Sequence, residues 1–410
     1  MVLKEFDSYM VFNEEACTRC GECFHKCPVL ELPLEKAKKE ITAILDDGKS
    51  KVLKKCVGCM NCNHYCPHDC RPYALIINKW HEKYLKNGLP GRAKLVLTLP
   101  YLNPYIHSFI IKKLPKEEKK WIREWEENIK NPGDKDTMIY ASCNLLVQPY
   151  MFQSKLYEDQ TIFGSTALCC GEPLFRAGLF EGHELVAKNL KQELEKIGFK
   201  KLIVPCIAGY NMFKYVYEAN YGVKMNFEIV SIVDWLYDEL KSGKYEITPL
   251  NITACVHDSC WPKMRGDTIF NKVRELLEMC GVKIIELEHS RENALCCGLS
   301  AACASYSIFP LLHHAKIRLK EFKKSGADIV VDYCGGCNWI FLIANSFSVK
   351  KKTTQPIHTV MEIVQMAIGE TPSEKSKKRG GKIIRSLLGK VIKAYLSTGR
   401  YNVEELANET

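Results

Sequence analysis

The spacing of cysteines is the feature of this sequence that points most directly to chemistry. The stretch "CTRCGECFHKCP" follows the pattern C-x2-C-x2-C-x3-C-P, and "CVGCMNCNHYCP" repeats it. Three thiols at this spacing can wrap one corner of a cubane [4Fe–4S] cluster, and in proteins with two such clusters the fourth cysteine binds the other cluster. A pair of zinc sites is the alternative, but zinc favours two CxxC pairs over runs of three that end in cysteine–proline. We therefore expect one cluster on Cys17, Cys20, Cys23 and Cys66, and a second on Cys56, Cys59, Cys62 and Cys27.

Adjacent cysteines form a second pattern. The stretch "NALCCGLSAACASY" holds Cys296 and Cys297, and the same CCG triplet occurs earlier, in "TALCCGEPLFRAG". Vicinal thiols make a poor disulfide because the ring would contain a distorted peptide. Three more cysteines accompany the later triplet: Cys260, Cys334 and Cys337. Five thiols exceed what one four-coordinate zinc uses, whereas an adjacent pair can bind or bridge different iron atoms.

The elements that must position these thiols occur twice. "TMIYASC" matches "ITACVHDSC", and "KKLIVPCIAG" matches "ADIVVDYCGGC", each an apolar, β-rich run that ends on cysteine. Cys169 precedes Cys296 by 127 residues, and the same alignment pairs Asp234 with Glu362. This duplication predicts two α/β units with small parallel sheets, whose cysteines lie at the carboxyl ends of strands.

The complete set of motifs resembles the D-type iron–sulfur protein of heterodisulfide reductase and its relatives, in which the iron–sulfur C and B subunits are fused. The likeness covers about residues 10–370, with two C-x2-C-x2-C-x3-C-P motifs followed by two CCG units. The resemblance implies an α-helical ferredoxin domain with two cubane clusters at the N-terminus. It also implies a noncubane [4Fe–4S] cluster in the second CCG unit, held by Cys260, Cys296, Cys297, Cys334 and Cys337.

The first CCG unit departs from the family pattern. Only 25 residues separate Cys143 from Cys169, and the closing motif reads "CIAG", with Gly209 where the last cysteine would stand. Two interpretations stay open for this unit. Either it holds a cluster on Cys143, Cys169, Cys170 and Cys206, or it is a metal-free unit kept for packing and pseudo-symmetry.

Three polar residues stand near the predicted second-unit site, in "CVHDSCWPKMR": His257, Asp258 and Lys263. They are catalytic candidates, since a histidine can give a proton to a leaving thiolate. The alternative is that they orient the loop. Four cysteines match no motif and are expected to be small buried residues, with Cys303 the one most open to another role: Cys70, Cys255, Cys280 and Cys303.

Length and composition predict an α+β multidomain protein. The chain has 410 residues and 21 cysteines, and "MVLKEFDSYM" has no features of an export signal. We therefore expect the cytoplasm, where thiolates can hold metal. The formal charge of +10 counts every cysteine as neutral, and we expect no nucleic-acid binding. The expected divisions are 1–92 (ferredoxin domain), 93–135 (bridge), 136–245 (first CCG unit), 246–372 (second CCG unit) and 373–410 (basic linker and C-terminal helix).

Two segments have an apolar character that needs a partner. Residues 381–396, "GKIIRSLLGKVIKAYL", predict a basic amphipathic helix. Such a helix can lie peripherally at the inner face of a membrane, dock on a partner subunit or fold back on its own domain. The apolar start of the bridge can pack between domains or contact a partner or membrane surface.

These patterns together predict the iron–sulfur subunit of a heterodisulfide-reductase-like oxidoreductase complex. Electrons would pass through two cubane clusters to or from the noncubane cluster, which would reduce or form a disulfide or persulfide-type bond on a disulfide or sulfur-carrier substrate. The expected partners are a flavoprotein, a membrane cytochrome or a quinone-linked subunit. The alternative is the electron-transfer subunit of a flavin-dependent glycolate, lactate or glycerol-3-phosphate dehydrogenase that feeds quinone. No GxGxxG motif follows a predicted strand, so in either case we expect any flavin dinucleotide in another subunit.

Overall fold

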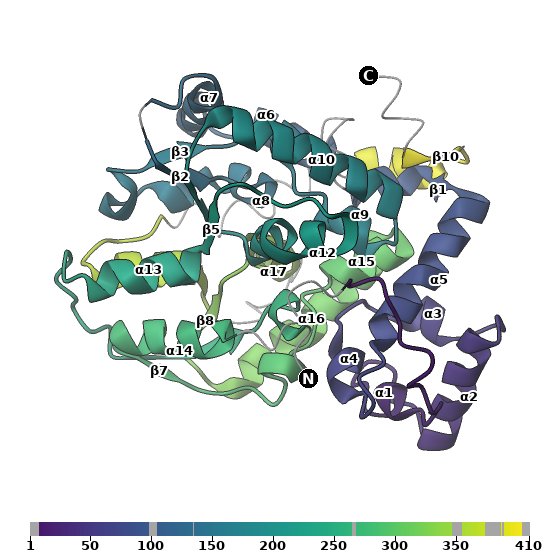
Figure 1. Ribbon diagram of the computed structural model, residues 1–410. Helices are drawn as coiled ribbons and strands as arrows, with labels where there is room; N and C mark the ends of the chain where they lie inside the picture. The colour runs from purple at the N-terminus through teal and green to yellow at the C-terminus, as the bar shows by residue number, and fades with distance from the viewer. Residues whose placement is uncertain are drawn as a thin grey trace.

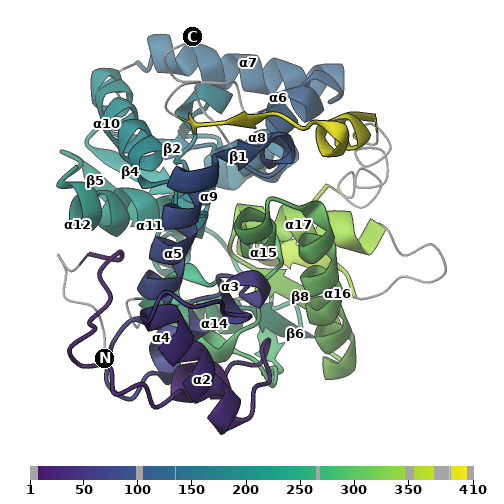
Figure 2. The same cartoon turned by 90° about the vertical axis from the view of Figure 1, so that its right-hand side faces the viewer.

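The computed structural model describes residues 8–97, 105–133, 135–264, 268–346, 355–373, 387 and 389–403. The N-terminal region is a group of helices, drawn in purple and dark blue in Figure 1. Its members are α1 (Glu22–His25), α2 (Leu34–Leu45), α3 (Val52–Lys55), α4 (Asn61–Tyr65) and α5 (Pro72–Asn87). Ala37, Ile41 and Ile44 lie on one face of α2 and are buried, as their helical spacing requires. Helix α5 leads from this group to strand β1 (Leu89–Pro90), as Figures 1 and 2 show.

Both N-terminal cysteine motifs use the same backbone turn. The residue before the second cysteine (Arg19 or Gly58) and the residue after it (Gly21 or Met60) have φ between 56° and 77°. These left-handed positions make the loop turn tightly. At Gly21 a side chain is excluded, because a Cβ would lie 2.6 Å from the backbone nitrogen of Lys38.

The bridge packs inside the chain along its described part. It contains the short helices η1 (Gly91–Leu95) and α6 (Tyr105–Lys112), followed by α7 (Lys116–Lys130). Ile110 and Leu114 are buried. Helix α7 lies against the first sheet region, where the rings of Trp125 and Phe152 meet edge to face at 5.2 Å. Of the alternatives for this segment, packing between parts of the chain therefore fits its described residues.

Two four-stranded sheets follow, and they have the same strand order. The first runs β3-β2-β4-β5 and the second runs β7-β6-β8-β9, with every pairing parallel. The first-unit strands are β2 (Thr137–Tyr140), β3 (Thr161–Phe163), β4 (Lys201–Val204) and β5 (Glu228–Ser231). The second-unit strands are β6 (Ile252–His257), β7 (Val282–Ile284), β8 (Ile329–Asp332) and β9 (Ile357–Thr359). Equivalent strands thus occupy equivalent places, as an internal duplication predicts.

Helices connect and cover these strands. In the first unit they are α8 (Cys143–Leu146), α9 (Glu172–Arg176), α10 (Phe180–Ile197), α11 (Ile207–Asn211), α12 (Tyr217–Tyr221) and α13 (Ile232–Lys241). In the second they are α14 (Ile269–Met279), α15 (Leu299–Ser305), α16 (Ile308–Ser325), α17 (Gly335–Ser346) and α18 (Val360–Ala367). The aligned residues Asp234 and Glu362 both occupy the third position of a helix. There Ser231 caps α13 and Thr359 forms a capping box with Glu362 on α18.

The end of the chain returns to its beginning. Strand β10 (Arg400–Tyr401) pairs antiparallel with β1. We call the helical residues 387 and 389–396 the C-terminal helix. Its Lys390 ammonium lies 4.2 Å from the centre of the Phe109 ring on α6, and the Tyr395 hydroxyl lies 2.8 Å from the Ser307 hydroxyl before α16. For these residues the structure favours folding back on the chain. Residues 381–386 and 388 of the predicted helix lie outside the described residues.

Among the described helices, none combines the length and the apolar character needed to cross a membrane.

Candidate functional site

The N-terminal cysteines gather in two small pockets. One pocket is lined by Cys17, Cys20, Cys23 and Cys66, and the other by Cys27, Cys56, Cys59 and Cys62. This is the grouping that the spacing predicts, in which each motif lends its fourth cysteine to the other group. We call the first set the outer thiols and the second set the inner thiols. Cys70 also lies at the outer pocket, where its backbone N–H donates to Cys66 Sγ at 3.3 Å.

The donor set of each pocket fits a [4Fe–4S] cluster. Four motif thiols line each space, which is the ligand number of a cubane. Burial raises the pKa of Cys56, and the neighbouring Cys59 thiol raises it further. Close thiols of this kind favour deprotonation by a bound metal rather than by water. Beside the inner pocket the Tyr73 hydroxyl is buried and has no hydrogen-bond partner within the described residues.

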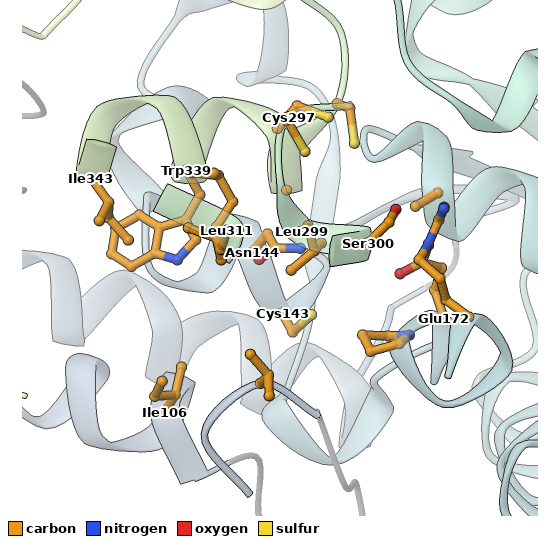
Figure 3. Close-up of a pocket in the computed structure, with 18 of the residues that line it drawn as sticks. Ile106, Cys143, Asn144, Glu172, Cys297, Leu299, Ser300, Leu311, Trp339 and Ile343 are labelled. Carbon is orange, nitrogen blue, oxygen red and sulfur yellow. The ribbon is translucent and has the colours of Figure 1, made fainter. Parts of the chain in front are cut away.

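A larger cavity of about 420 Å³ lies where the carboxyl ends of both sheets meet. We call it the central cavity (Figure 3). Eight cysteines line it, four from each CCG unit: Cys143, Cys169, Cys170 and Cys206 from the first, and Cys260, Cys297, Cys334 and Cys337 from the second. The duplicated strands therefore bring together thiols that are far apart in the sequence, as expected for parallel sheets.

The adjacent cysteines of the second unit take different positions. Cys297 lines the central cavity, and hydrogen bonds from Cys296 and Cys337 lower its pKa to about 6. Cys296 accepts the N–H of Gly298 at 3.2 Å and lies close enough to the inner thiols to raise the pKa of Cys56. The pair thus faces two sides of the structure, the cavity and the N-terminal region.

The first unit also gathers its four cysteines. Cys169 Sγ lies 3.7 Å from Cys143 Sγ, and Cys206 Sγ lies 3.9 Å from Cys334 Sγ of the second unit. At Gly209, the position of the missing fifth cysteine, a Cβ would lie 3.9 Å from Cys170 Sγ. The first unit therefore keeps the placement of a metal site but offers one thiol fewer than the second.

Three buried polar groups on the cavity wall have no partner within the described structure. The Ser142 and Ser259 hydroxyls each stand directly before the first motif cysteine of their unit, Cys143 or Cys260, at equivalent positions of the repeat. The third is Nδ1 of His107, whose Nε2 lies 3.2 Å from Asn144 Oδ1. Buried polar groups are rarely left unpaired, so these three indicate that a bound group completes the site.

An arginine that the sequence analysis missed lies between the thiol sites. Arg176 on α9 donates to Glu172 Oε1 at 2.5 Å, to the carbonyl oxygen of Gly58 at 2.7 Å and to Cys260 Sγ at 3.2 Å. Its guanidinium also stacks over the Trp261 ring at 4.9 Å. A single buried side chain of the first unit thus contacts both the inner-thiol loop and the second unit. The only signal in the sequence was its position six residues after Cys170.

The three predicted catalytic side chains do not line the central cavity in the described structure. His257 is the nearest, with a ring nitrogen within 4.8 Å of the Cys297 and Cys337 sulfurs. Its Nδ1 accepts from Arg318 Nε at 3.3 Å, which leaves the proton on Nε2. Burial and the Arg318 charge lower the pKa of His257 to about 3, so the imidazole is neutral.

Asp258 and Lys263 instead hold the surrounding loops. Asp258 accepts two hydrogen bonds from Arg274, at 3.0 and 2.9 Å. Lys263 Nζ donates to Asn61 Oδ1 at 2.6 Å and so ties the second unit to helix α4. These contacts agree with the alternative that Asp258 and Lys263 orient the loop rather than take part in catalysis.

The cysteines outside the motifs, and two glycines of the second unit, pack against other parts of the chain. Cys255, Cys280 and Cys303 are buried, and Cys303 lies on α15 away from the cavity wall. Gly298 is needed for local packing, since its φ is 104° and a Cβ would lie 2.3 Å from the Leu311 carbonyl oxygen. Gly336 lies against the first unit, where its Cβ would be 3.2 Å from Asn144 Nδ2. At both glycines the atoms in close contact therefore belong to another part of the chain.

Comparison with known proteins agrees with this class of site. Residues 9–67 match the family model of a 4Fe-4S dicluster domain, and residues 158–214 and 254–341 match that of a cysteine-rich domain named CCG. The fold and the thiol groups thus define an iron–sulfur protein with a dicluster domain and a duplicated cysteine-rich domain.

The relatives narrow this class. The chain is 22% identical to the D-type subunit of the dihydromethanophenazine:CoB–CoM heterodisulfide reductase of Methanosarcina mazei, over 89% of this chain and 97% of that protein. It is 22% identical to the EtfAB:quinone oxidoreductase of Syntrophomonas wolfei, over 72% of this chain and 49% of that protein. It is 26% identical to the C-type subunit of the anaerobic glycerol-3-phosphate dehydrogenase of Escherichia coli, over 42% of this chain and 44% of that protein. This chain is an iron–sulfur oxidoreductase subunit related to the D-type subunit of heterodisulfide reductase.

Proposed function

We propose that this chain carries electrons from a partner redox subunit to the central cavity, where a sulfur–sulfur bond is reduced, or runs the same reaction in reverse. The single observation that carries the proposal is the arrangement of thiols. The inner thiols adjoin the second CCG unit, and that unit's thiols face a cavity large enough for a small molecule.

The residues proposed to hold the cofactors follow from the groups described above. The outer and inner thiols would each hold a cubane. A noncubane [4Fe–4S] cluster would be held by Cys260, Cys296, Cys297, Cys334 and Cys337. When bound, these clusters would supply one-electron carriers and a sulfur-binding iron centre, and the protein would position them. We propose no cluster in the first unit, because Gly209 leaves it one thiol short.

Buried side chains support this electron path because they connect the N-terminal region to the second CCG unit. Lys263 and Arg176 connect α4 and the Gly58 loop to the second unit through buried hydrogen bonds. Arg176 also donates to Cys260 Sγ, which favours the thiolate form of that ligand. His257 carries its proton on Nε2 and has a ring nitrogen within 4.8 Å of the Cys297 and Cys337 sulfurs, so it would help to orient these ligands. We therefore assign His257 a positioning role.

The names of the relatives support the proposal that the partners are redox proteins. The Methanosarcina mazei relative belongs by name to a heterodisulfide reductase, and the more weakly matching proteins are named a quinone oxidoreductase and a part of a dehydrogenase. We propose a flavoprotein, a cytochrome or a quinone-linked subunit as the partner. The rival function, electron relay for a flavin-dependent dehydrogenase, would need no substrate in the central cavity.

An assay with reduced methyl viologen separates the two functions. We expect anaerobically purified, cluster-loaded protein to oxidise viologen when a small disulfide is added. Cys334→Ser should lower the rate by more than about 100-fold, since ligand loss exceeds the usual effect of changing a group around a metal. The matched control is Cys280→Ser, because Cys280 is buried, lies off the cavity wall and matches no motif. Absence of disulfide reduction, together with co-purification of a flavoprotein, would favour electron relay.

A further inference from the structure

We infer that the substrate of the central cavity is an uncharged disulfide that carries apolar groups, and not an anionic one. The inference rests on the proposed function and adds the chemical class of the substrate. It comes from three properties of the cavity wall: an apolar side, a single cation that is already paired, and neutral polar groups beside the thiols.

One side of the cavity is apolar and is built by elements from four parts of the chain. Ile106 and Ile110 come from α6, Leu311 from α16, Ile343 from α17 and Val391 from the C-terminal helix. Figure 3 shows Ile106 and Ile343 on the side of the view away from Glu172. A hydrocarbon group placed against this side would leave water, which favours binding.

The opposite side offers no free positive charge among the described residues. Arg176 is the one arginine or lysine on the described wall, and each of its three nitrogens already donates a hydrogen bond, to Glu172, the Gly58 carbonyl and Cys260. Glu172 adds a carboxylate to the same wall. Bound clusters with four or more thiolates would add further negative charge. A carboxylate or phosphate on the substrate would therefore lose its hydration without gaining a counter-charge.

The buried polar groups on the described cavity wall that have no hydrogen-bond partner are neutral. They are the Ser142 and Ser259 hydroxyls and Nδ1 of His107. The two serines stand beside Cys143 and Cys260, so they can donate hydrogen bonds to sulfur at the thiol end of the cavity. We therefore place the sulfur–sulfur bond of the substrate at this end and its apolar groups along the opposite side.

The reaction balances with a one-electron donor of low potential. One disulfide takes up two electrons, delivered singly through the N-terminal region, and two protons from water. The sulfur–sulfur bond breaks and two thiols leave. Both thiols are neutral, so their release returns no net charge to the cavity.

The test compares three disulfides of the same backbone: dithiodipropionate, its dimethyl ester and its diamide. The ester and the diamide are both uncharged, and the diamide separates the effect of charge from that of apolar character. With reduced viologen and the loaded full-length chain, we expect kcat/KM for the ester to exceed that for the dianion by about tenfold or more. The value of kcat/KM for the diamide should fall between those for the ester and the dianion. A dianion reduced as well as the ester would overturn the inference.

A pair of variants on one helix provides the matched control. Val391→Lys places a cation on the apolar wall and should shift the ester-to-dianion ratio of kcat/KM toward the dianion by about tenfold. Ile392→Lys adds the same charge one residue later, where the side chain is 57% exposed, and should leave the ratio unchanged. Equal ratios in both variants would contradict the placement of the substrate.

A binding measurement keeps the inference separate from the proposed function. Thioether analogues of the ester and the dianion, in which one sulfur is replaced by a methylene, cannot be reduced. Calorimetry should show the ester analogue binding about tenfold more tightly. If no disulfide is reduced but the ester analogue binds preferentially, the proposed function fails and the ligand class stands. If the dianion analogue binds as tightly, the ligand class fails whatever the activity.

Discussion

At the scale of single residues, Arg176 links three parts of the chain. The residue is 1% exposed, and its guanidinium contacts the inner-thiol loop, the Glu172 carboxylate and the Cys260 thiol. Nothing in the local sequence predicts these contacts, because they form only when the first CCG unit packs against the second unit and the N-terminal region. The grouping of the N-terminal cysteines, by contrast, follows from the spacing within and between their two motifs.

Arg176→Gln should destabilise the protein by about 3–5 kcal/mol, because it leaves the Glu172 carboxylate buried without its cation. The double variant Arg176→Gln with Glu172→Gln should recover most of the loss, since the neutral pair leaves no uncompensated charge. Thermal unfolding of the anaerobic proteins measures both effects. Equal stability of the single and double variants would contradict a tightly coupled pair.

Gly209 is the residue that separates the two CCG units chemically. A Cβ at this position meets Val204 and Cys170 at ordinary van der Waals distances, 3.5 and 3.9 Å, so a side chain can begin here without displacing its neighbours. Gly209→Cys would restore the fifth thiol.

We therefore expect Gly209→Cys to raise the iron content from about twelve to about sixteen per chain, one further four-iron cluster. Ala208→Cys adds a thiol one residue earlier, out of register with the motif, and serves as the control. An unchanged iron content in Gly209→Cys would show that the missing thiol is not what keeps a cluster out. About sixteen irons in the wild-type chain would place a cluster in the first unit without it.

At the scale of elements, the repeat was visible in the sequence because two β-rich runs in each unit lead into a cysteine, and the parallel sheets follow from it. The role of the glycines in helix packing could not be predicted from the sequence. Gly298 lies at the start of α15 and permits close contact with α16, whereas Gly336 permits contact with α8 of the other unit. Close approach of two helices depends on tertiary packing, which the spacing of residues does not encode.

Gly298→Ala should therefore disturb the second CCG unit more than an ordinary glycine replacement. The backbone has a φ of 104°, and the new Cβ would lie 2.3 Å from a backbone oxygen. The control is Gly326→Ala at the end of α16, where φ is 71° and the space around a Cβ is open. The control should cost about 1 kcal/mol, and Gly298→Ala should also lose about four irons per chain. Retention of full iron content in Gly298→Ala would contradict the role assigned to this turn.

At the scale of the whole molecule, the bridge, the two CCG units and the returning C-terminal segment meet around one cavity. The sequence predicted the separate parts from local motifs. It left open how the bridge and the last helix pack, since their apolar faces fit several partners equally well. In the structure α6 and the C-terminal helix complete the apolar side of the cavity through Ile106 and Val391, so the described parts of both segments have a place within the chain.

The central claim is that the second CCG unit holds a redox-active cluster beside the two N-terminal ones. The most direct test is the content of iron and acid-labile sulfide per chain in anaerobically purified protein, combined with EPR spectra of the oxidised and reduced states. We predict about twelve irons and a signal distinct from those of two cubanes. About eight irons, with cubane signals alone, would contradict the claim and leave a chain that only relays electrons.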